Sequence, residues 1–245
     1  MLSFVVPAHN ESQLIGKTVR CLHEAGATAG EPYEIVVVDD ASTDDTAALA
    51  VRAGACVVHA DVRHIAAARN IGARAAAGEH LLFVDADTWL SGDTALAALH
   101  AMRGGAAGGG ARVRLDGPVP FYARPGVAAT FGAFRLFNWT VGCFMFCTRD
   151  AFDRTGGFDE RLFAAEEVAF SRAIKRVGRL ELVEPAVVTS ARKFRTHSLR
   201  EFLRMGLGAL HVGRAVRSRH RLSIWYGERR HDPGPPQVPE KGSGT

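Results

Sequence analysis

The first half of the chain alternates short apolar runs with longer segments of helical pattern. Four runs, at residues 2–6, 34–38, 55–59 and 81–84, have the length of strands that are buried on both faces. The segments between them repeat apolar positions at helical spacing or are rich in alanine. This alternation predicts an α/β fold, with a mostly parallel central sheet and helices on both of its faces.

Glycines and capping residues mark the ends of these predicted helices. Residues 14, 15, 19 and 22 are apolar and share one helical face, and Gly26 is predicted to end that helix. Ser and Asp are preferred N-cap residues, so a second helix is expected to begin near Asp44, before an alanine-rich segment. Residues 65–77 form the third predicted helix, with Gly78 as its C-cap.

The second half of the chain carries weaker patterns. Residues 104–110 are rich in glycine and are predicted to be a loop that leads into a strand, and no GK[ST] follows them, so they are not a phosphate loop. Residues 116–140 are interpreted as loop, and their aromatic rings as either core or a wall that binds an acceptor. The remaining predicted elements are strands at 111–115 and 141–148, a helix from near Ala164 to Gly178, and short strands at 180–183 and 186–189 around Pro185.

The C-terminal region predicts a further amphipathic helix at residues 199–216, with one apolar and one basic face. Two interpretations remain for it: a helix that lies on an anionic membrane, and a helix that packs on the domain. From residue 231 the chain is rich in Pro and Gly and is expected to be disordered. We therefore divide the chain into a domain at 1–190, with a nucleotide-binding half at about 1–115 and an acceptor half at about 116–190, a basic helical extension at 191–230, and a tail at 231–245.

Polar and acidic residues follow three of the predicted strands, at 7–11, 39–46 and 85–88. Right-handed crossovers bring the carboxyl ends of parallel strands to one edge of a sheet, where such folds bind ligands. At this edge Asp85 and Asp87 are separated only by Ala86. Two carboxylates there suit Mg²⁺ or Mn²⁺, which would also hold phosphate oxygens. The alternative is a polar turn that caps the next helix.

Composition narrows the class of protein. The chain has 245 residues, of which 47% are hydrophobic and 23% charged, as is usual for a globular protein. No apolar run is long enough to span a bilayer, and the first residues resemble a strand rather than a signal peptide. The 4 cysteines form no CxxC pair, which favours reduced thiols in a cytosolic protein.

Positive charge is concentrated near the C-terminus. The net charge of the whole chain is +4, yet residues 192–230 hold 11 Lys and Arg against two Asp and Glu. This distribution indicates an anionic surface as the partner of that region, and it does not mark the whole protein as a nucleic-acid binder.

Four segments in this order resemble the family 2 glycosyltransferases, which have the GT-A fold and bind nucleotide sugars. They are VVPAHNES, IVVVDDASTDDT, ARNIGARAAAGEHLLFVDADT and GGFDERLFAAEE, within residues 2 to about 178. Each segment alone is a weak signal. Together they are specific for the fold and the class of cofactor, and less so for the sugar or the acceptor.

The resemblance implies where the nucleotide sugar binds. Glu11 is expected near the ribose hydroxyls, Asp39 accepts a hydrogen bond from the base, with uracil preferred and guanine not excluded, and Arg69 approaches the diphosphate or the base. The full implied set is Pro7, Ala8, Glu11, Asp39, Asp40, Arg69, Asp85, Ala86 and Asp87.

The resemblance also implies a divalent metal, Mn²⁺ or Mg²⁺, held by Asp87 as the more direct ligand together with Asp85. His197 is a candidate third ligand, and a surface or core histidine is the alternative. Glu166 and Glu167 occupy the positions where the family usually has Glu and Asp, which makes Glu167 the expected general base and Glu166 the second candidate. Glutamate is one methylene longer than aspartate, so the sequence departs from the family here.

Two further groups of basic side chains have open assignments. His9, in the first loop, is a candidate contact to phosphate. Arg192, Lys193 and Arg195 form either a flap over the diphosphate or an acidic acceptor, or a solvated basic patch.

Glycosyl transfer needs a stabilised diphosphate leaving group and a carboxylate that takes the proton of the acceptor hydroxyl. One base and no covalent intermediate predict a single displacement with inversion at the anomeric carbon. The alternatives are a non-catalytic nucleotide-sugar-binding protein and, less favoured, a sugar-phosphate nucleotidyltransferase. No Gln/Arg-Arg-Trp motif or spanning segment indicates a polysaccharide synthase.

The acceptor and the location are less constrained. The aromatic region and the basic helix suit a lipid-linked acceptor and peripheral membrane contact, and a soluble small molecule is the alternative. We expect a cytoplasmic protein, with the inner face of the membrane as the alternative site of action, and no nucleic-acid partner.

Overall fold

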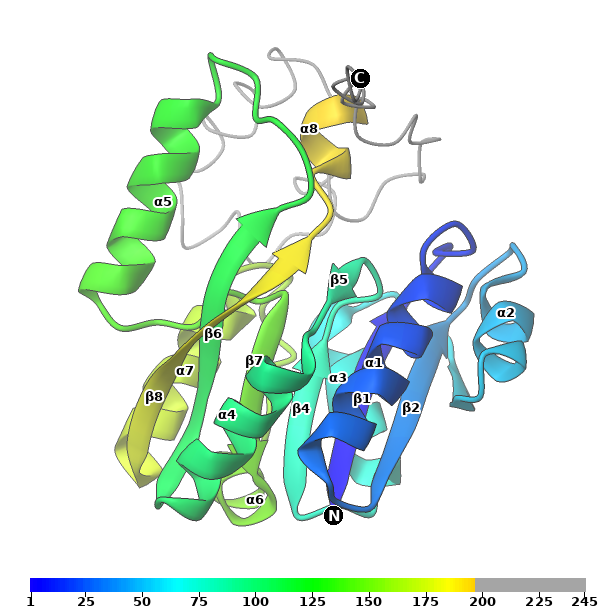
Figure 1. Ribbon diagram of the computed structural model, residues 1–245, viewed down its shortest axis with the longest axis horizontal. Helices are drawn as coiled ribbons and strands as arrows, with labels where there is room; N and C mark the ends of the chain where they lie inside the picture. The colour runs from blue at the N-terminus through cyan, green and yellow to red at the C-terminus, as the bar shows by residue number, and fades with distance from the viewer. Residues whose placement is uncertain (197–245) are drawn as a thin grey trace, which may run out of the picture.

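The computed structural model describes residues 1–196, which form a mixed α/β fold around one eight-stranded sheet (Figure 1). The strand order is β3-β2-β1-β4-β7-β6-β8-β5. The strands are β1 (Leu2–Ala8), β2 (Tyr33–Asp40), β3 (Cys56–Ala60), β4 (His80–Val84), β5 (Thr88–Trp89), β6 (Ala106–Leu115), β7 (Phe144–Thr148) and β8 (Arg179–Thr189). The helices are α1 (Ile15–Ala29), α2 (Thr46–Arg52), α3 (Ile65–Ala75), α4 (Gly92–Arg103), α5 (Arg124–Leu136), α6 (Arg149–Thr155), α7 (Glu166–Val177) and α8 (Arg192–Thr196).

The predicted parallel sheet is confirmed for the first half of the chain. Strands β3, β2, β1 and β4 are parallel, and Phe4 lies in register with Ile35 on one side and Leu82 on the other. The second half is mixed, because β7 runs antiparallel to both β4 and β6, β8 is parallel to β6, and β5 is antiparallel to β8. The carboxyl ends of β1, β2 and β4 therefore share one edge.

Helices cover both faces of the sheet, as the alternation of elements predicts. One face packs against α1 and α4, with Val19 and Leu99 in its core cluster. The other face packs against α3, α6 and α7, with Phe152 and Ile174 in a second cluster. Figure 1 shows the same two layers, with α1 and α4 in front of the sheet and α3 and α7 behind it. No helix within residues 1–196 combines the length and hydropathy needed to cross a bilayer.

Two predicted helix ends are wrong, because the glycines serve packing instead. Helix α1 continues to Ala29 and ends at Gly30, whose φ of 69° is left-handed. Gly26 lies inside the helix, where an added Cβ would be 2.6 Å from the ring of Tyr33. Helix α3 ends at Ala75, and Gly78 instead packs against the start of β1, where its N–H donates to Ser3 Oγ (2.8 Å).

The glycine-rich segment and the proline of the second half also lie within strands. Gly108, Gly109 and Gly110 belong to β6, and an added Cβ at Gly109 would be 1.8 Å from the carbonyl oxygen of Glu181 in β8. Strand β8 runs through Pro185, near an irregularity in its pairing with β6 where the ladder skips. A proline is tolerated there because no ladder hydrogen bond is required of it.

Three helices of the structure lie where the sequence did not predict them. Residues 116–140, predicted as loop, contain helix α5, and α4 and α6 are helices that the sequence patterns did not indicate. All four cysteines are free, as expected, but only Cys143 and Cys147 lie in the core, where reduced thiols were expected; Cys21 is partly buried and Cys56 is exposed. The predicted amphipathic helix at 199–216, the tail at 231–245 and His197 lie outside the described residues.

Candidate functional site

A cavity of about 370 Å³ opens at the carboxyl edge of β1, β2 and β4, beneath α5 and beside the start of α7. Strand ends, loops and helices from the whole described chain contribute to its wall, from Pro7 to Phe194. Of the candidate basic residues, His9 and Lys193 line this cavity, whereas Arg192 and Arg195 do not. Of the described residues that the resemblance assigns to the nucleotide, the metal or catalysis, all line the cavity except Asp39. They are Pro7, Ala8, Glu11, Asp40, Arg69, Asp85, Ala86, Asp87, Glu166 and Glu167.

Arg69 is the buried centre of the site, with 1% of its surface exposed. Its Nη2 donates to Asp85 Oδ1 (2.9 Å) and to the carbonyl oxygen of Gly142 (2.7 Å), while its Nη1 donates to Glu166 Oε1 (2.9 Å). Burial alone would lower the pKa of Arg69, but the charges of Asp85 and Glu166 raise it. A permanently charged guanidinium therefore joins α3, the turn after β4 and the first turn of α7.

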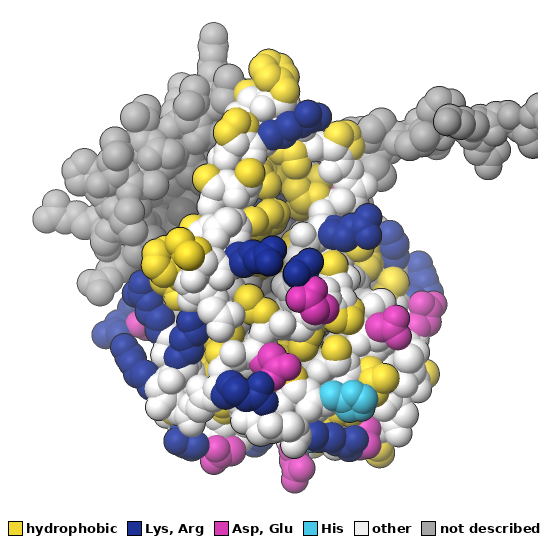
Figure 2. All heavy atoms as spheres, turned by 60° about the vertical axis from the view of Figure 1, so that its left-hand side comes forward, with side chains coloured by type: hydrophobic (Ala, Val, Ile, Leu, Met, Phe, Trp, Pro, Cys, Tyr) yellow, Lys and Arg dark blue, Asp and Glu magenta, His cyan; other side chains and the backbone are white. Residues whose placement is uncertain are grey.

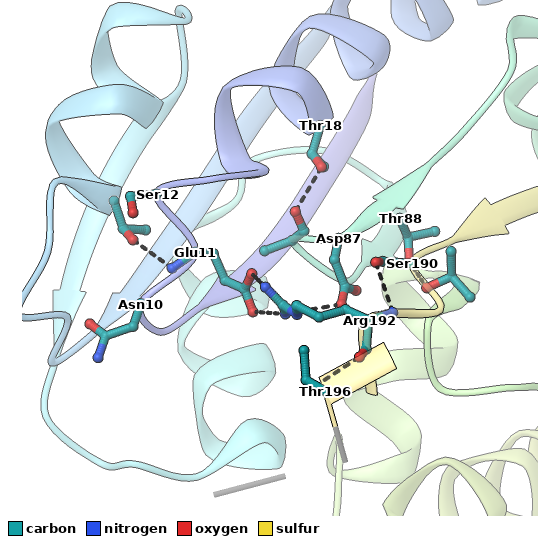
Figure 3. A network of polar contacts seen from close by, with 12 residues as sticks. Asn10, Glu11, Ser12, Thr18, Asp87, Thr88, Ser190, Arg192 and Thr196 are labelled. Carbon is teal, nitrogen blue, oxygen red and sulfur yellow. Dashed lines mark hydrogen bonds and ion pairs between the residues drawn. The ribbon is translucent and has the colours of Figure 1, made fainter. Parts of the chain in front are cut away.

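Arg192 is a second buried cation, 5% exposed, and the sequence analysis placed it only in a basic flap or patch. It makes a bidentate pair with Glu11, with both Nη–Oε distances at 2.8 Å, and its Nη2 is 3.2 Å from Asp87 Oδ2. Figure 3 shows Arg192 between the two carboxylates, with Ser190 accepting its backbone N–H. No local pattern signals this contact, because the paired residues are 181 positions apart.

Asp39 and Asp40 have different environments. Both oxygens of Asp40 accept backbone N–H groups from the loop after β3, those of Val62, Arg63 and His64, at 2.8–2.9 Å. Asp40 thus shapes the cavity wall through this loop. Asp39 is 6% exposed, its Oδ2 lies 3.2 Å from His59 Nδ1, and its Oδ1 has no hydrogen-bond partner among the described residues.

The backbone around the site is strained. Asn10, Ala41, Arg63 and Ala165 have φ values of 51°, 56°, 46° and 61°, which L-residues with a Cβ rarely adopt. Three of them lie in the loops that follow β1, β2 and β3, and Ala165 is the N-cap of α7, directly before Glu166. Such strain clusters at functional sites, where the surrounding structure holds it in place.

The two glutamates at the start of α7 differ in their partners. Glu166 is 6% exposed and is paired with Arg69. Glu167 has no ion pair with Lys or Arg among residues 1–196. Burial, and then the charge of Glu166, raises the pKa of Glu167 to about 8. Glu167 therefore takes up a proton more readily than an ordinary glutamate does.

Asp85 and Asp87 fit a divalent cation that also binds a ligand. They follow β4 on one short turn, and their side chains are 26% and 15% exposed. Burial raises the pKa of Asp85, Arg69 opposes this rise, and Asp87 adds to it, so a positive ion beside them would favour both charges. Within residues 1–196 no three His, Cys, Asp or Glu side chains form a complete metal cluster. Phosphate and water oxygens would supply the remaining positions, as is usual for Mg²⁺.

Comparison with known proteins gives a family match and a curated relative, which is matched in two strains of one species. Residues 3–158 match the model of a family described as Glycosyl transferase family 2. Undecaprenyl-phosphate 4-deoxy-4-formamido-L-arabinose transferase from Klebsiella pneumoniae subsp. pneumoniae is 32% identical over 97 residues, which cover 35% of this chain and 28% of that protein. The chain thus matches little more than a quarter of the relative's length, and the match of the family model ends before Glu166.

Solved structures share the fold. The mannosyltransferase PcManGT from Pyrobaculum calidifontis, in complex with GDP-Man and Mn²⁺, has a TM-score of 0.65 and 23% identity, over 89% of this chain and 64% of that one. TarS 1–349 from S. aureus, in complex with UDP-GlcNAc, has a TM-score of 0.62 and 19% identity, over 91% of this chain and 70% of that one. At these identities the likeness establishes a GT-A architecture and nothing more.

Proposed function

The chain belongs to glycosyl transferase family 2, and from this premise we propose that it is an inverting, metal-dependent enzyme that moves a sugar from a nucleoside diphosphate to an acceptor hydroxyl. One observation carries the proposal. A single cavity brings the Asp85–Asp87 pair together with Glu167, a carboxylate whose pKa is raised. Asp85 and Asp87 suit the cation that binds the leaving diphosphate, and Glu167 suits the acceptor.

Different residues of the cavity have different roles in the proposed reaction. Asp87 and Asp85 would hold a divalent cation, which when bound supplies positive charge to the departing diphosphate. Arg69 positions Asp85 and Glu166 at once, so that the cation side and the acceptor side of the cavity keep a constant spacing. Glu11 and Arg192 close the nucleoside side.

Glu167 takes the proton from the acceptor hydroxyl as the new glycosidic bond forms. Glu166 is less suited to this step, because its charge already serves the ion pair with Arg69. One base and no covalent intermediate give a single displacement with inversion at the anomeric carbon. The bond to the diphosphate breaks as the bond to the acceptor oxygen forms, and the proton ends on Glu167.

Uridine is the preferred base and guanosine the alternative. Asp39 Oδ1 is a buried acceptor that lacks a partner among the described residues, and such a group needs an N–H donor. Both uracil N3–H and guanine N1–H meet this need. The structural neighbours bind GDP-Man in one case and UDP-GlcNAc in the other, so they support the class of donor without choosing the base.

A lipid-linked acceptor at the cytoplasmic face of a membrane is the preferred second substrate. The curated relative is named for undecaprenyl phosphate, a membrane lipid. A phosphate acceptor needs no base and is repelled by carboxylates, whereas a hydroxyl needs a base. The adjacent Glu166 and Glu167 therefore support a hydroxyl on such a lipid-linked molecule.

Calorimetric titration with UDP and with GDP, each with and without Mn²⁺, tests the proposal. We expect one nucleotide to bind in a metal-dependent manner, and we expect binding to be lost in Asp87→Ala and retained in Asp153→Ala, which removes an exposed acid on α6. Absence of binding by either nucleotide would refute the proposed donor site. Metal-dependent binding without sugar transfer to any acceptor, or to water, would favour a non-catalytic nucleotide-sugar-binding protein.

A further inference from the structure

Helix α5 presents an unusual surface, because none of its residues is buried. At its two ends lie three of the most exposed large apolar side chains in the described part of the chain: Phe121 is 81% exposed, Leu136 79% and Phe137 53%. Figure 1 shows α5 at the upper left, beside the upper half of β6 and away from the helices that cover the sheet. A large exposed apolar surface of this kind marks a site of interaction.

The helix is apolar on both of its faces. Its inner face supplies Thr130, Phe131 and Phe134 to the wall of the cavity. Helical spacing places a second set of residues on the opposite side, all of them exposed. This outer set is Pro125, Ala128, Ala129, Gly132 and Leu136. A helix without a polar face is normally buried on all sides, so we expect the outer face of α5 to be buried against another molecule.

The charges around α5 indicate which kind of surface its outer face contacts. Residues 117–149 contain no Asp or Glu, and Arg124 and Arg135 flank the outer face and are exposed. Two basic residues of α7 contact the residues that follow α5. Lys175 donates to the carbonyl oxygen of Phe137 (2.7 Å), and Arg172 lies 5.0 Å from the ring of Trp139. Figure 2 shows hydrophobic side chains gathered in the upper part of the described surface, with Lys and Arg beside them.

Aromatic residues mark both ends of the segment. Phe121 and Tyr122 precede α5, and Phe137 and Trp139 follow it, with the last two rings stacked at 4.8 Å. An apolar helical face with aromatic ends and a basic border is the pattern of a helix that lies in the interface of an anionic bilayer. A second protein surface would need no such excess of positive charge.

We propose that residues 121–137 are the membrane-docking surface of this protein, with the outer face of α5 in the headgroup region of an anionic bilayer. The inner face then places Phe131 and Phe134 between the bilayer and Glu167, as an apolar wall along which a lipid-linked acceptor enters the cavity. The entry of the acceptor rests on the proposed function, whereas the docking itself does not.

Flotation with vesicles of phosphatidylglycerol and phosphatidylcholine in equal parts, and with phosphatidylcholine alone, tests the docking of the full chain. We expect binding only to the anionic vesicles. The double variant Phe121→Ser/Leu136→Ser should bind at least about tenfold more weakly, because it removes two large apolar side chains from the interface. Arg124→Gln/Arg135→Gln should weaken binding most at low salt. Val51→Ser, which changes a 58% exposed apolar residue on α2, is the matched control and should bind as the wild type does.

Several outcomes would overturn the docking surface: wild-type flotation of the Phe121→Ser/Leu136→Ser variant, an equal loss in Val51→Ser, or a wild-type dimer that this double variant converts to a monomer. The last result would assign the face to a second copy of the chain. Nucleotide titration of the same variants separates this inference from the proposed function. Normal metal-dependent nucleotide binding with unchanged flotation refutes the docking surface alone, and absence of nucleotide binding in the wild type refutes the donor site alone.

Discussion

At the scale of single residues, two buried arginines hold the acidic side chains of the site. Arg69 pairs with Asp85 and Glu166, and Arg192 pairs with Glu11 and Asp87. Each carboxylate is buried or partly buried, and it would be costly there without a positive partner. The site therefore consists of charges that are already oriented before any substrate binds.

Glu167 should give the reaction its pH dependence. Burial and the charge of Glu166 raise its pKa to about 8, and only the ionised form accepts a proton, so kcat should rise with pH and level off above about 8. The variant Glu167→Gln should lose about 10²–10⁴-fold in kcat and keep its affinity for the nucleotide. A pH–rate profile of both proteins measures this. Glu184→Gln, at an exposed position on β8, is the control, and full activity of Glu167→Gln would contradict the assignment.

The same raised pKa affects stability. A carboxyl whose pKa is higher in the folded state stabilises the fold most below its ordinary pKa of 4.5, and this contribution is lost as pH rises through about 8. Relative to wild type, Glu167→Gln should therefore become more stable as the pH increases from 6 to about 9. Urea midpoints of the two proteins across this range provide the measurement, and parallel curves would show that Glu167 is ionised throughout.

Arg192→Ala should destabilise the protein by about 3–5 kcal/mol, because it removes the guanidinium that pairs with the buried Glu11 and the neighbouring Asp87. Added Mn²⁺ should restore part of this loss by supplying positive charge at Asp87, so it should raise the melting temperature more in the variant than in the wild type. Arg154→Ala is the matched control. It removes only an exposed ion pair with Asp150 and should change stability by less than about 1 kcal/mol.

At the scale of elements, β6 depends on glycine where it crosses close to β8. Gly109→Ala places a methyl group against the backbone oxygen of Glu181, so it should cost about 1–3 kcal/mol or more in the free energy of unfolding. Gly132→Ala is the control in α5, where an added Cβ meets nothing within 4 Å, and it should stabilise the helix by about 0.5–1 kcal/mol. Denaturant unfolding compares the two, and equal stabilities would contradict the close approach.

The elements that could be predicted are those with a strong local period. The runs at 2–6, 34–38 and 81–84 are strands because each is apolar on both faces. Helix α1 shows its periodicity directly, and α3 was predicted from its alanine content. Glycine-rich β6 lacks such a signal, since its residues are chosen for contact with β8 and β7 rather than for their own propensity. Helix α5 was missed because it contains Pro125, Gly126 and Gly132, which are typical of loops.

At the scale of the whole molecule, the cavity joins distant segments, and ligand binding should stabilise all of them together. In saturating Mn²⁺, a nucleotide at 100 times its Kd should raise the free energy of unfolding by about 2.7 kcal/mol relative to Mn²⁺ alone. Thermal unfolding in Mn²⁺, with and without the nucleotide, measures this shift. It should be absent in Asp87→Ala and present in Asp153→Ala, and an equal shift in both variants would place the ligand away from the predicted site.

The sequence by itself determined the fold class and the acidic strand ends. Local period identifies the strands, and crossovers of one hand bring their carboxyl ends to the same edge, so Asp85, Asp87 and Glu11 could be assigned to one site without coordinates. The tertiary structure decided three features that no local pattern encodes. Strand β7 pairs antiparallel with β4, Arg192 lies between Glu11 and Asp87, and the outer face of α5 is exposed. These features arise from contacts between residues far apart in the chain, and such contacts depend on how the whole chain packs.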